Sequence, residues 1–138
     1  MAKVLVVGAG GREHAIAYKF KQEGHEIYMV GVNPAVNKFG TCLTISEQKI
    51  PDFCLNNNID LVFVGPEVPL VNGLVDVLQE KGIRAFGPSK KASQLEGSKV
   101  FSKMMMKKYN IPTAKYESFS DYEKASQYLA KQKAPIVL

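Results

Sequence analysis

The sequence contains no apolar run of the roughly 18 to 20 residues that a membrane-spanning helix needs. Its beginning also lacks the basic flank, apolar stretch and cleavage site of a secretion signal. We therefore expect a cytoplasmic protein with no membrane partner. Hydrophobic residues make up 46% of the chain and charged residues 22%, ordinary values for a globular protein, so disordered and collagen-like classes are excluded.

Cysteine is scarce, and its spacing argues against a metal or disulfide site. The two cysteines, Cys42 and Cys54, form no C-x-x-C motif and no cluster with histidine. We expect both to be reduced thiols with structural roles. No pair of carboxylates is spaced for a metal ion either, so we assign no metal ligand.

An excess of basic charge is absent from most of the chain. Residues 1–97 hold ten basic and ten acidic residues, whereas residues 98–138 hold eight lysines and three acidic residues, so the net charge of +5 belongs to the second part. Four of these lysines lie at helical spacing, which is typical of a solvent-exposed helix face. They are Lys99, Lys103, Lys107 and Lys108. We expect no nucleic-acid partner.

The first part of the chain alternates buried strands with amphipathic helices. Residues 3–8 (KVLVVG) form a continuous apolar run, the pattern of a strand buried on both faces of a parallel sheet. Residues 12–24 have apolar positions at helical spacing, and Gly24 ends that helix. A second strand follows at residues 26–32. Together they predict a βαβ unit with a right-handed crossover.

The alternation continues further along the chain. Pro51 suits the first turn of a short helix that we expect to end at Asn57. Residues 59–65 (IDLVFVG) form the clearest strand, residues 66–82 a helix that ends at a glycine, and residues 83–87 a short strand. Four strands and three helices predict an α/β domain with an open, doubly wound, mostly parallel Rossmann-like sheet.

The pattern changes after residue 97. Residues 98–109 predict a Met- and Lys-rich helix that ends before a proline, and residues 114–119 (AKYESF) predict a strand. Ser120 and Glu123 predict a capping box at the start of a helix that runs to about Gln132.

An apolar strand begins at residue 134, and the sequence stops at Leu138. A strand without a partner leaves an exposed apolar edge. We therefore expect a truncated chain, with one domain over residues 1–97 and an incomplete second domain over residues 98–138.

A glycine-rich turn lies at residues 6–15 (VVGAGGREHA), between the first strand and the first helix. Gly8 and Gly10 match the first two glycines of the dinucleotide-binding fingerprint G-x-G-x-x-G, but Glu13 stands in place of the third. No carboxylate follows the second strand, where the ribose of NAD would need one. A nicotinamide-binding domain is therefore the weaker alternative.

The same turn suits a phosphate. Glycines let the backbone approach a ligand, the start of a helix donates free N–H groups, and Arg12 adds a bidentate donor. This combination favours a single phosphate with a sugar attached. The alternative is that the glycines serve only the turn and that Arg12 and Glu13 are solvated.

Two further polar residues follow strands of the predicted sheet. Glu67 lies in residues 64–70 (VGPEVPL), where its carboxylate can accept from ribose hydroxyls or from an amine, and Asn33 follows the second strand. With the glycine turn, both lie at carboxyl ends of parallel strands, where open α/β sheets bind ligands. Glu67 also fits a purely structural role as an acid at a helix start.

Four stretches of this sequence together resemble the N-terminal part of glycinamide ribonucleotide synthetases, the phosphoribosylamine–glycine ligases of purine biosynthesis. They are VVGAGGREHA, DLVFVGPEVPLVNGLVD, FGPSKKASQLEGSKVFSK and IPTAKY. The resemblance implies that residues 1–97 are a pre-ATP-grasp domain that binds phosphoribosylamine and that residues 98–138 begin an ATP-grasp domain. The implied reaction joins glycine to 5-phosphoribosylamine through glycyl phosphate, with ATP converted to ADP and phosphate.

The resemblance also implies roles for individual residues. Gly10, Gly11 and Arg12 become candidates for the phosphate end of phosphoribosylamine, and Asn33 and Glu67 for its ribose and amine. Asn33 lies in GVNPAVN, where the family usually has a P-G-N turn.

On the ATP side, the resemblance implies that Lys99 contacts the nucleotide phosphates. The full-length enzyme would use ATP with Mg²⁺ or Mn²⁺, and most of their ligands would lie beyond Leu138. We therefore expect no catalytic residue in this chain, no bound cofactor and no activity of the chain alone. The remaining alternative is a non-catalytic nucleotide-binding module that is complete as it stands.

Overall fold

The computed structural model describes residues 1–137 of the chain. The chain divides into two compact units, Met1–Gly97 and Ser98–Leu138. None of the helices within residues 1–137 is long and apolar enough to cross a membrane.

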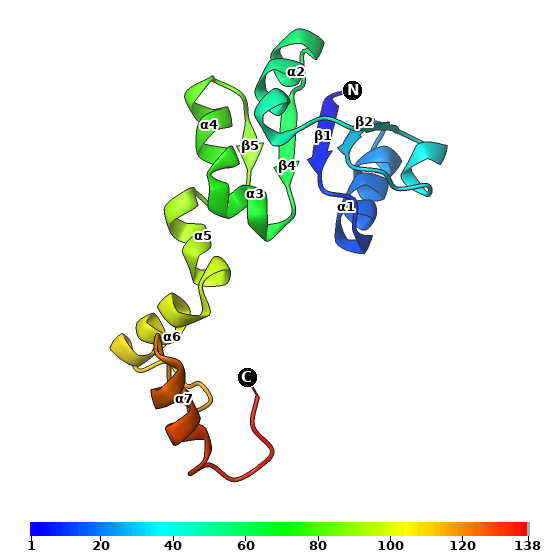
Figure 1. Cartoon of the computed structure of the whole chain (residues 1–138). Helices are drawn as coiled ribbons and strands as arrows, with labels where there is room; N and C mark the ends of the chain where they lie inside the picture. Colours follow the sequence, from blue (N-terminus) through cyan, green and yellow to red (C-terminus); the bar gives the residue numbers. More distant parts are fainter. Residues whose placement is uncertain (138) are drawn as a thin grey trace. The chain divides into compact units, whose positions relative to one another are not determined.

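The first unit is built on a five-stranded parallel sheet (Figure 1). In spatial order its strands are β3 (Thr41–Leu43), β2 (Glu26–Val30), β1 (Lys3–Val7), β4 (Leu61–Val64) and β5 (Ala85–Phe86). From β1 the chain moves outward to β2 and β3, then returns to the other side of β1 and continues through β4 to β5. This confirms the predicted doubly wound parallel sheet. The short strand β3 was not predicted.

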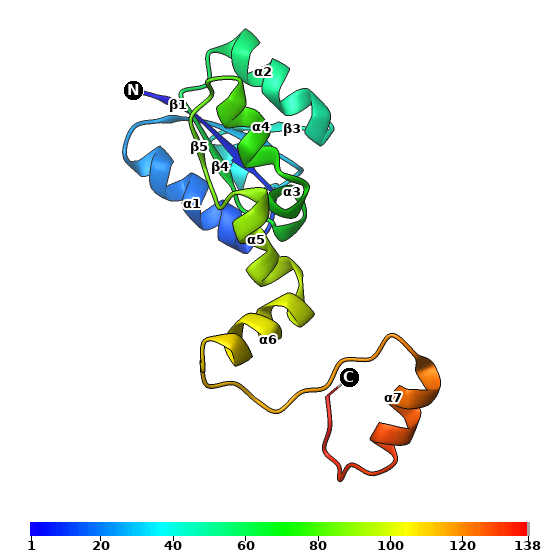
Figure 2. The same cartoon turned by 90° about the vertical axis from the view of Figure 1, so that its left-hand side faces the viewer.

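Helices cover both faces of this sheet, and β1 contributes to both apolar cores. Figure 2 shows α1 (Gly11–Gln22) and α4 (Leu74–Glu80) on opposite sides of the strands. On the α1 side, Val4 and Val6 pack with Ala17. On the other side, Leu5 and Val7 belong to the core that α2 (Ile50–Asn57) and α4 complete. Alternate residues of a strand point to opposite faces, which explains this division.

The helix predicted at residues 66–82 is two helices, α3 (Glu67–Asn72) and α4. Gly73 separates them with φ of 94°, a left-handed conformation that a helix interior does not contain. Leu74 and Leu78 pack in the core as their spacing predicts, whereas Val77 is 41% exposed. The periodicity survives the break because both helices lie against the same face of the sheet.

Three short helices of the first unit were not predicted. They are the 3-10 helices η1 (Val36–Lys38) and η2 (Glu47–Lys49), and α5 (Lys90–Gly97). The N–H of Lys90 donates to the carboxylate of Asp76 at 3.0 Å, and Gly97 lies against Val71. These contacts attach α5 to α3 and α4.

Both cysteines are free thiols, as predicted. Cys54 lies on α2 and is buried in the core, and this burial raises the pKa of its thiol from 9.0 to about 11. Cys42 is half-buried in β3, and its thiol donates to the carbonyl of Asn33 at 3.6 Å.

The second unit contains α6 (Lys99–Lys108) and α7 (Tyr122–Leu129). Ser98 caps α6 by accepting from the N–H of Phe101 at 3.2 Å. The predicted capping box at α7 is wrong, because Asp121 is the capping residue and accepts from the N–H of Lys124 at 2.9 Å. A carboxylate at this position interacts more strongly with the helix start than a hydroxyl does.

The strands predicted at residues 114–119 and from residue 134 are wrong for the described residues, which are irregular there; Leu138 lies outside them. A strand needs a neighbour for its backbone groups, and within residues 98–137 no strand pairs with either segment. Lys103 instead attaches the first segment to α6, since its Nζ donates to the carbonyl of Ala114 at 3.3 Å and lies 5.5 Å from the centre of the Tyr116 ring. Of the predicted solvent-exposed lysine face, Lys99, Lys107 and Lys108 are exposed and Lys103 is half-buried.

Candidate functional site

The loops that follow β1 and β4 meet at the carboxyl edge of the sheet. Because β1 and β4 are neighbours and the chain leaves them in opposite directions, this edge is the topological switch point, where open α/β sheets bind ligands. The N–H of Gly65 donates to the carbonyl of Val7 at 3.2 Å, which holds the two loops together. The predicted site residues of the first unit lie at this edge.

Glu13 occupies the space between the two loops. It is 4% exposed, and its carboxylate accepts from the N–H of Gly10 at 2.9 Å and from Nε of Arg12 at 2.7 Å. A Cβ atom on Gly65 would clash with this carboxylate, and one on Gly10 would lie 2.8 Å from it. The idea that Glu13 is solvated is therefore wrong. In the sequence, the signal that could have revealed this buried position is the replacement of the third fingerprint glycine by Glu13.

Arg12 projects from the first turn of α1 toward the second loop. Its side chain is 52% exposed, and its Nη1 lies 4.0 Å from Oε1 of Glu67. The hydrogen bond to Glu13 and the negative charges of Glu13, Glu67 and Glu96 raise the pKa of Arg12 above its usual value. The guanidinium is thus a permanent cation, with Nε bonded to Glu13, Nη1 near Glu67 and a half-exposed side chain.

Glu67 is the first residue of α3, and its side chain is half-exposed. An acid at this position interacts favourably with the helix start, so Glu67 has a structural role as well as a position at the site. Gly11 begins α1 with open space around it, since an added Cβ would meet no atom within 4 Å. The start of α1 is accessible next to the Arg12 and Glu67 side chains.

Asn33 fixes the loop geometry behind the site. Its Nδ2 donates to the carbonyl of Ala9 at 3.0 Å, and its Oδ1 accepts from the N–H groups of Ala35 and Val36. The side chain thus joins the segment after β2 to the glycine turn after β1. These bonds are the structural contribution of Asn33.

Lys99 belongs to the second unit, where it begins α6 and is exposed. It lies at the wall of a cavity of about 680 Å³ formed within that unit, together with Tyr116, Phe119 and Leu129. Among residues 1–137, no group of three His, Cys, Asp or Glu side chains could hold a metal ion.

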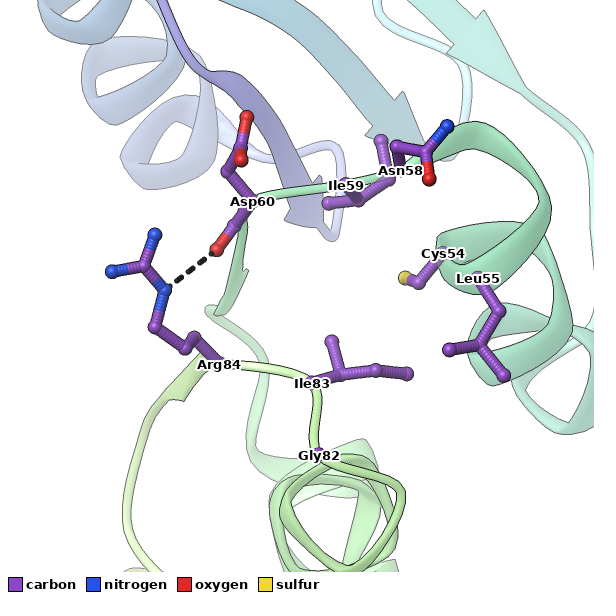
Figure 3. Close-up of a pocket in the computed structure, with 8 residues that line it drawn as sticks. All are labelled: Cys54, Leu55, Asn58, Ile59, Asp60, Gly82, Ile83 and Arg84. Atoms are coloured by element: carbon purple, nitrogen blue, oxygen red, sulfur yellow. Dashed lines mark hydrogen bonds between the residues drawn. The ribbon is translucent and has the colours of Figure 1, made fainter.

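A different cavity of about 340 Å³ lies at the opposite, amino edge of the sheet (Figure 3). Cys54 and Ile83 form apolar walls, and Arg84 lies on the rim with its Nε bonded to the carbonyl of Asp60 at 3.1 Å. The carboxylate of Asp60 already accepts from the N–H of Lys3 at 2.7 Å. This edge carries no helix start among the residues that line the cavity, whereas the carboxyl edge has the open start of α1 beside Arg12.

The fold defines a class of protein. N5-carboxyaminoimidazole ribonucleotide synthetase from Thermotoga maritima has a similar fold, with a TM-score of 0.67 at 19% identity over 93% of this chain and 36% of that chain. The biotin carboxylase domain of a single-chain bacterial carboxylase gives a TM-score of 0.71 at 14% identity, over 94% of this chain and 34% of that chain. The chain therefore shares an α/β fold with these two enzymes over most of its length.

Sequence comparison then identifies the family. Residues 2–96 match the phosphoribosylglycinamide synthetase N domain, and residues 97–138 match the ATP-grasp (A) domain of the same enzyme. The chain belongs to the phosphoribosylglycinamide synthetase family, which confirms the resemblance found in the sequence.

Similar proteins agree with this family. The phosphoribosylamine–glycine ligase of Halalkalibacterium halodurans is 48% identical over 98% of this chain and 33% of its own length. The bifunctional purine biosynthetic protein purD of Dictyostelium discoideum is 47% identical over 98% of this chain and 17% of its own length. The crystal structure of phosphoribosylamine–glycine ligase from Thermotoga maritima gives a TM-score of 0.73 at 29% identity, over 96% of this chain and 31% of that chain. The chain thus spans about a third of the single-function ligases that it resembles.

Proposed function

We propose that this chain provides the phosphoribosylamine-binding part of a phosphoribosylamine–glycine ligase. The observation that carries the proposal is the meeting of Arg12 and Glu67 beside the open start of α1, at the switch point of the sheet. A cation, helix N–H groups and a carboxylate at one edge suit a ligand with a phosphate at one end and an amine at the other. Relatives named as this ligase support the same substrate.

In the proposed complex, the ligand phosphate accepts from the N–H groups of Gly11 and Arg12 and from the outer nitrogens of the Arg12 guanidinium. Gly10 contributes by its lack of a side chain, because its N–H already donates to Glu13. Asn33 supports the glycine turn through Ala9 and lies behind the ribose. Glu67 accepts from a ribose hydroxyl or from the amine.

The proposed reaction belongs to the whole ligase. ATP phosphorylates the glycine carboxylate, the amine of phosphoribosylamine attacks the carbonyl carbon of glycyl phosphate, and phosphate leaves as the amide bond forms. In this sequence Glu67 orients the amine so that its lone pair faces the acyl group. The carboxylate oxygens of Glu67, one of which lies 4.0 Å from Nη1 of Arg12, accept hydrogen bonds from N–H or O–H donors.

Lys99 is proposed to contact ATP phosphates from the second unit. A lysine at the start of a helix adds its charge to that of the free N–H groups, and the combination favours phosphate oxygens. ATP phosphates would also need a divalent ion such as Mg²⁺, for which we assign no ligands in this chain. Because the proposed substrates are soluble metabolites, we place this function in the cytoplasm.

A titration with ribose 5-phosphate, followed by NMR of the ¹⁵N-labelled chain, tests the proposal. We expect the largest shift changes at Gly11, Arg12 and Glu67, with little change at Asp60 and Arg84 at the opposite edge. Addition of ATP or NADH should leave the Gly11 and Arg12 signals in place. Saturable changes from NADH at Gly11, with none from ribose 5-phosphate, would favour a dinucleotide-binding domain instead.

A further inference from the structure

Glu13 is the one fully enclosed carboxylate at the proposed site within residues 1–137. A buried carboxylate is costly unless donors satisfy it, and Glu13 has two, the N–H of Gly10 and Nε of Arg12. Both hydrogen bonds are short, at 2.9 and 2.7 Å. The charge is therefore matched by the same arginine that faces the proposed ligand.

The bond from Arg12 Nε fixes the plane of the guanidinium. A free arginine side chain samples many rotamers. If it becomes ordered only when a ligand binds, the lost entropy weakens binding. With Nε bonded to Glu13 and Nη1 4.0 Å from Glu67, the half-exposed side chain of Arg12 is held before any ligand arrives. An arginine ordered in advance binds phosphate more tightly than a mobile one.

The position of the Glu13 carboxylate is itself fixed by glycines. Gly65 has no room for a Cβ beside the carboxylate, and a Cβ on Gly8 would lie 2.9 Å from Glu13 Cγ. The side chain therefore fills the space that a third fingerprint glycine would leave open for close packing of helix and strand. A ligand must lie outside this space, over Gly11.

We propose that Glu13 is a positioning residue that orients Arg12 for a sugar monophosphate. This inference rests on the proposed function of the site. Glu13 does not touch the ligand and acts through Arg12.

A double-mutant cycle on the 138-residue chain, with ribose 5-phosphate as the probe, tests the inference. We expect E13Q to weaken binding about tenfold and R12A to weaken it at least as much, with E13Q causing no further loss in the R12A background. E26Q is the matched control, because Glu26 likewise accepts a side-chain hydrogen bond, from Tyr28 at 2.6 Å, but lies at the amino end of β2. This variant should bind as the unchanged chain does.

The Nε–H signal of Arg12 in ¹H–¹⁵N spectra reports on its bond to Glu13. If Glu13 only stabilised the fold, replacing it would leave this signal unchanged. In the unchanged chain it should be a slowly exchanging, downfield signal before ligand is added, and E13Q should remove that feature while the Gly8 and Gly65 amide signals persist. Should E13Q fail to fold, E13D keeps the charge but is too short to reach both donors, and it replaces E13Q in the cycle.

The outcomes separate this inference from the proposed function. If the unchanged chain binds ribose 5-phosphate at Gly11 and Arg12 but E13Q binds equally well, or if the two losses add, the role of Glu13 is refuted and the proposed function stands. If the unchanged chain does not bind ribose 5-phosphate, both fail. Loss of binding in E13Q that disappears in the R12A background supports both.

Discussion

The Nη1 atom of Arg12 lies 4.0 Å from Oε1 of Glu67, so the first turns of α1 and α3 contribute opposite charges to one edge of the sheet. Both side chains are about half-exposed. An ion pair of this kind stabilises a fold by about 0 to 1 kcal/mol. Because this stabilisation is small, the ion pair is better explained by the two charges that it offers to a ligand than by a contribution to the stability of the fold.

Replacing Glu67 should change ligand preference more than stability. In E67A, loss of the carboxylate removes an acceptor for ribose hydroxyls and also relieves repulsion of phosphate near Arg12. Inorganic phosphate should then bind as tightly as before or tighter. The affinity for ribose 5-phosphate should fall about tenfold relative to the affinity for phosphate. Calorimetric titration with both ligands measures the ratio.

E80A serves as the control for E67A, because Glu80 is an exposed acid at the end of α4. It should leave the ratio unchanged. Equal weakening of both ligands by E67A would mean that Glu67 only shapes the loop.

Adding a methyl group at Gly65 should destabilise the first unit. G65A places a Cβ against the buried Glu13 carboxylate, and we expect a loss of about 1 to 3 kcal/mol in unfolding free energy, typical of overpacking. Urea unfolding followed by circular dichroism gives this value. In an E13A background the same substitution should cost much less, since the clashing group is gone.

G11A is the matched control for G65A, because its new methyl group meets no atom within 4 Å. Its stability should change by no more than about 0.5 kcal/mol. If G65A were as stable as G11A, the close packing of Glu13 against the second loop would be wrong.

The buried thiol of Cys54 should make stability fall at alkaline pH. Its pKa is raised from 9.0 to about 11, so in this interval the unfolded chain loses a proton that the folded chain keeps. The contribution is fully present below pH 9 and declines as the pH rises toward 11, by about 2 to 3 kcal/mol in total. Unfolding free energies at a series of pH values measure it.

Tyr28 contributes to the same alkaline decline, because its hydrogen bond to Glu26 raises its pKa too. The C54A variant separates the two residues. It should start less stable at neutral pH because a small cavity replaces the thiol, and it should show a shallower alkaline decline. An identical slope with and without Cys54 would contradict the assignment.

The start of α7 should depend on Asp121 and not on Ser120. D121A removes the acceptor for the N–H of Lys124 and should lower the stability of that helix by about 1 kcal/mol. Hydrogen exchange of the α7 amides should accelerate about fivefold in D121A and remain unchanged in S120A. The reverse result would restore the capping box that the sequence suggested.

Much of the first unit follows from its sequence because buried parallel strands are continuous apolar runs. Residues 3–8 and 59–65 carry that signal, and Gly24 and Gly82 adopt the positive φ angles that helix ends favour. The strand β3 has only three residues, too few for a periodic pattern. The break at Gly73 is hidden because apolar spacing continues across it.

Errors in the second unit have a different cause. The segment AKYESF has the composition of a strand, but strand formation depends on a neighbour, and side chains alone do not specify one. At α7, Ser120 and Asp121 are adjacent residues that are both good caps. The sequence alone does not specify which of the two caps the helix.

The candidate site was partly readable from sequence. Gly11, Arg12 and Glu67 each follow a parallel strand, and the carboxyl ends of parallel strands lie at one edge of a sheet. Their placement at this edge could therefore be predicted from the order of the elements along the chain. The burial of Glu13 was not predicted, because its space is created by Gly65, far away along the chain. The replacement of the third fingerprint glycine by Glu13 argues against a dinucleotide, and the structure shows that this residue is buried against the second loop.

The orientation of bound ribose 5-phosphate tests the account most directly. Isotope-filtered NOE spectra of the ¹⁵N-labelled chain with ¹³C-labelled ribose 5-phosphate report which ligand protons lie near which amides. We predict contacts from the C5 protons to the amides of Gly11 and Arg12, and from the C1 proton to the start of α3 at Glu67. Contacts of the reverse orientation, or contacts at the cavity beside Arg84, would contradict the account.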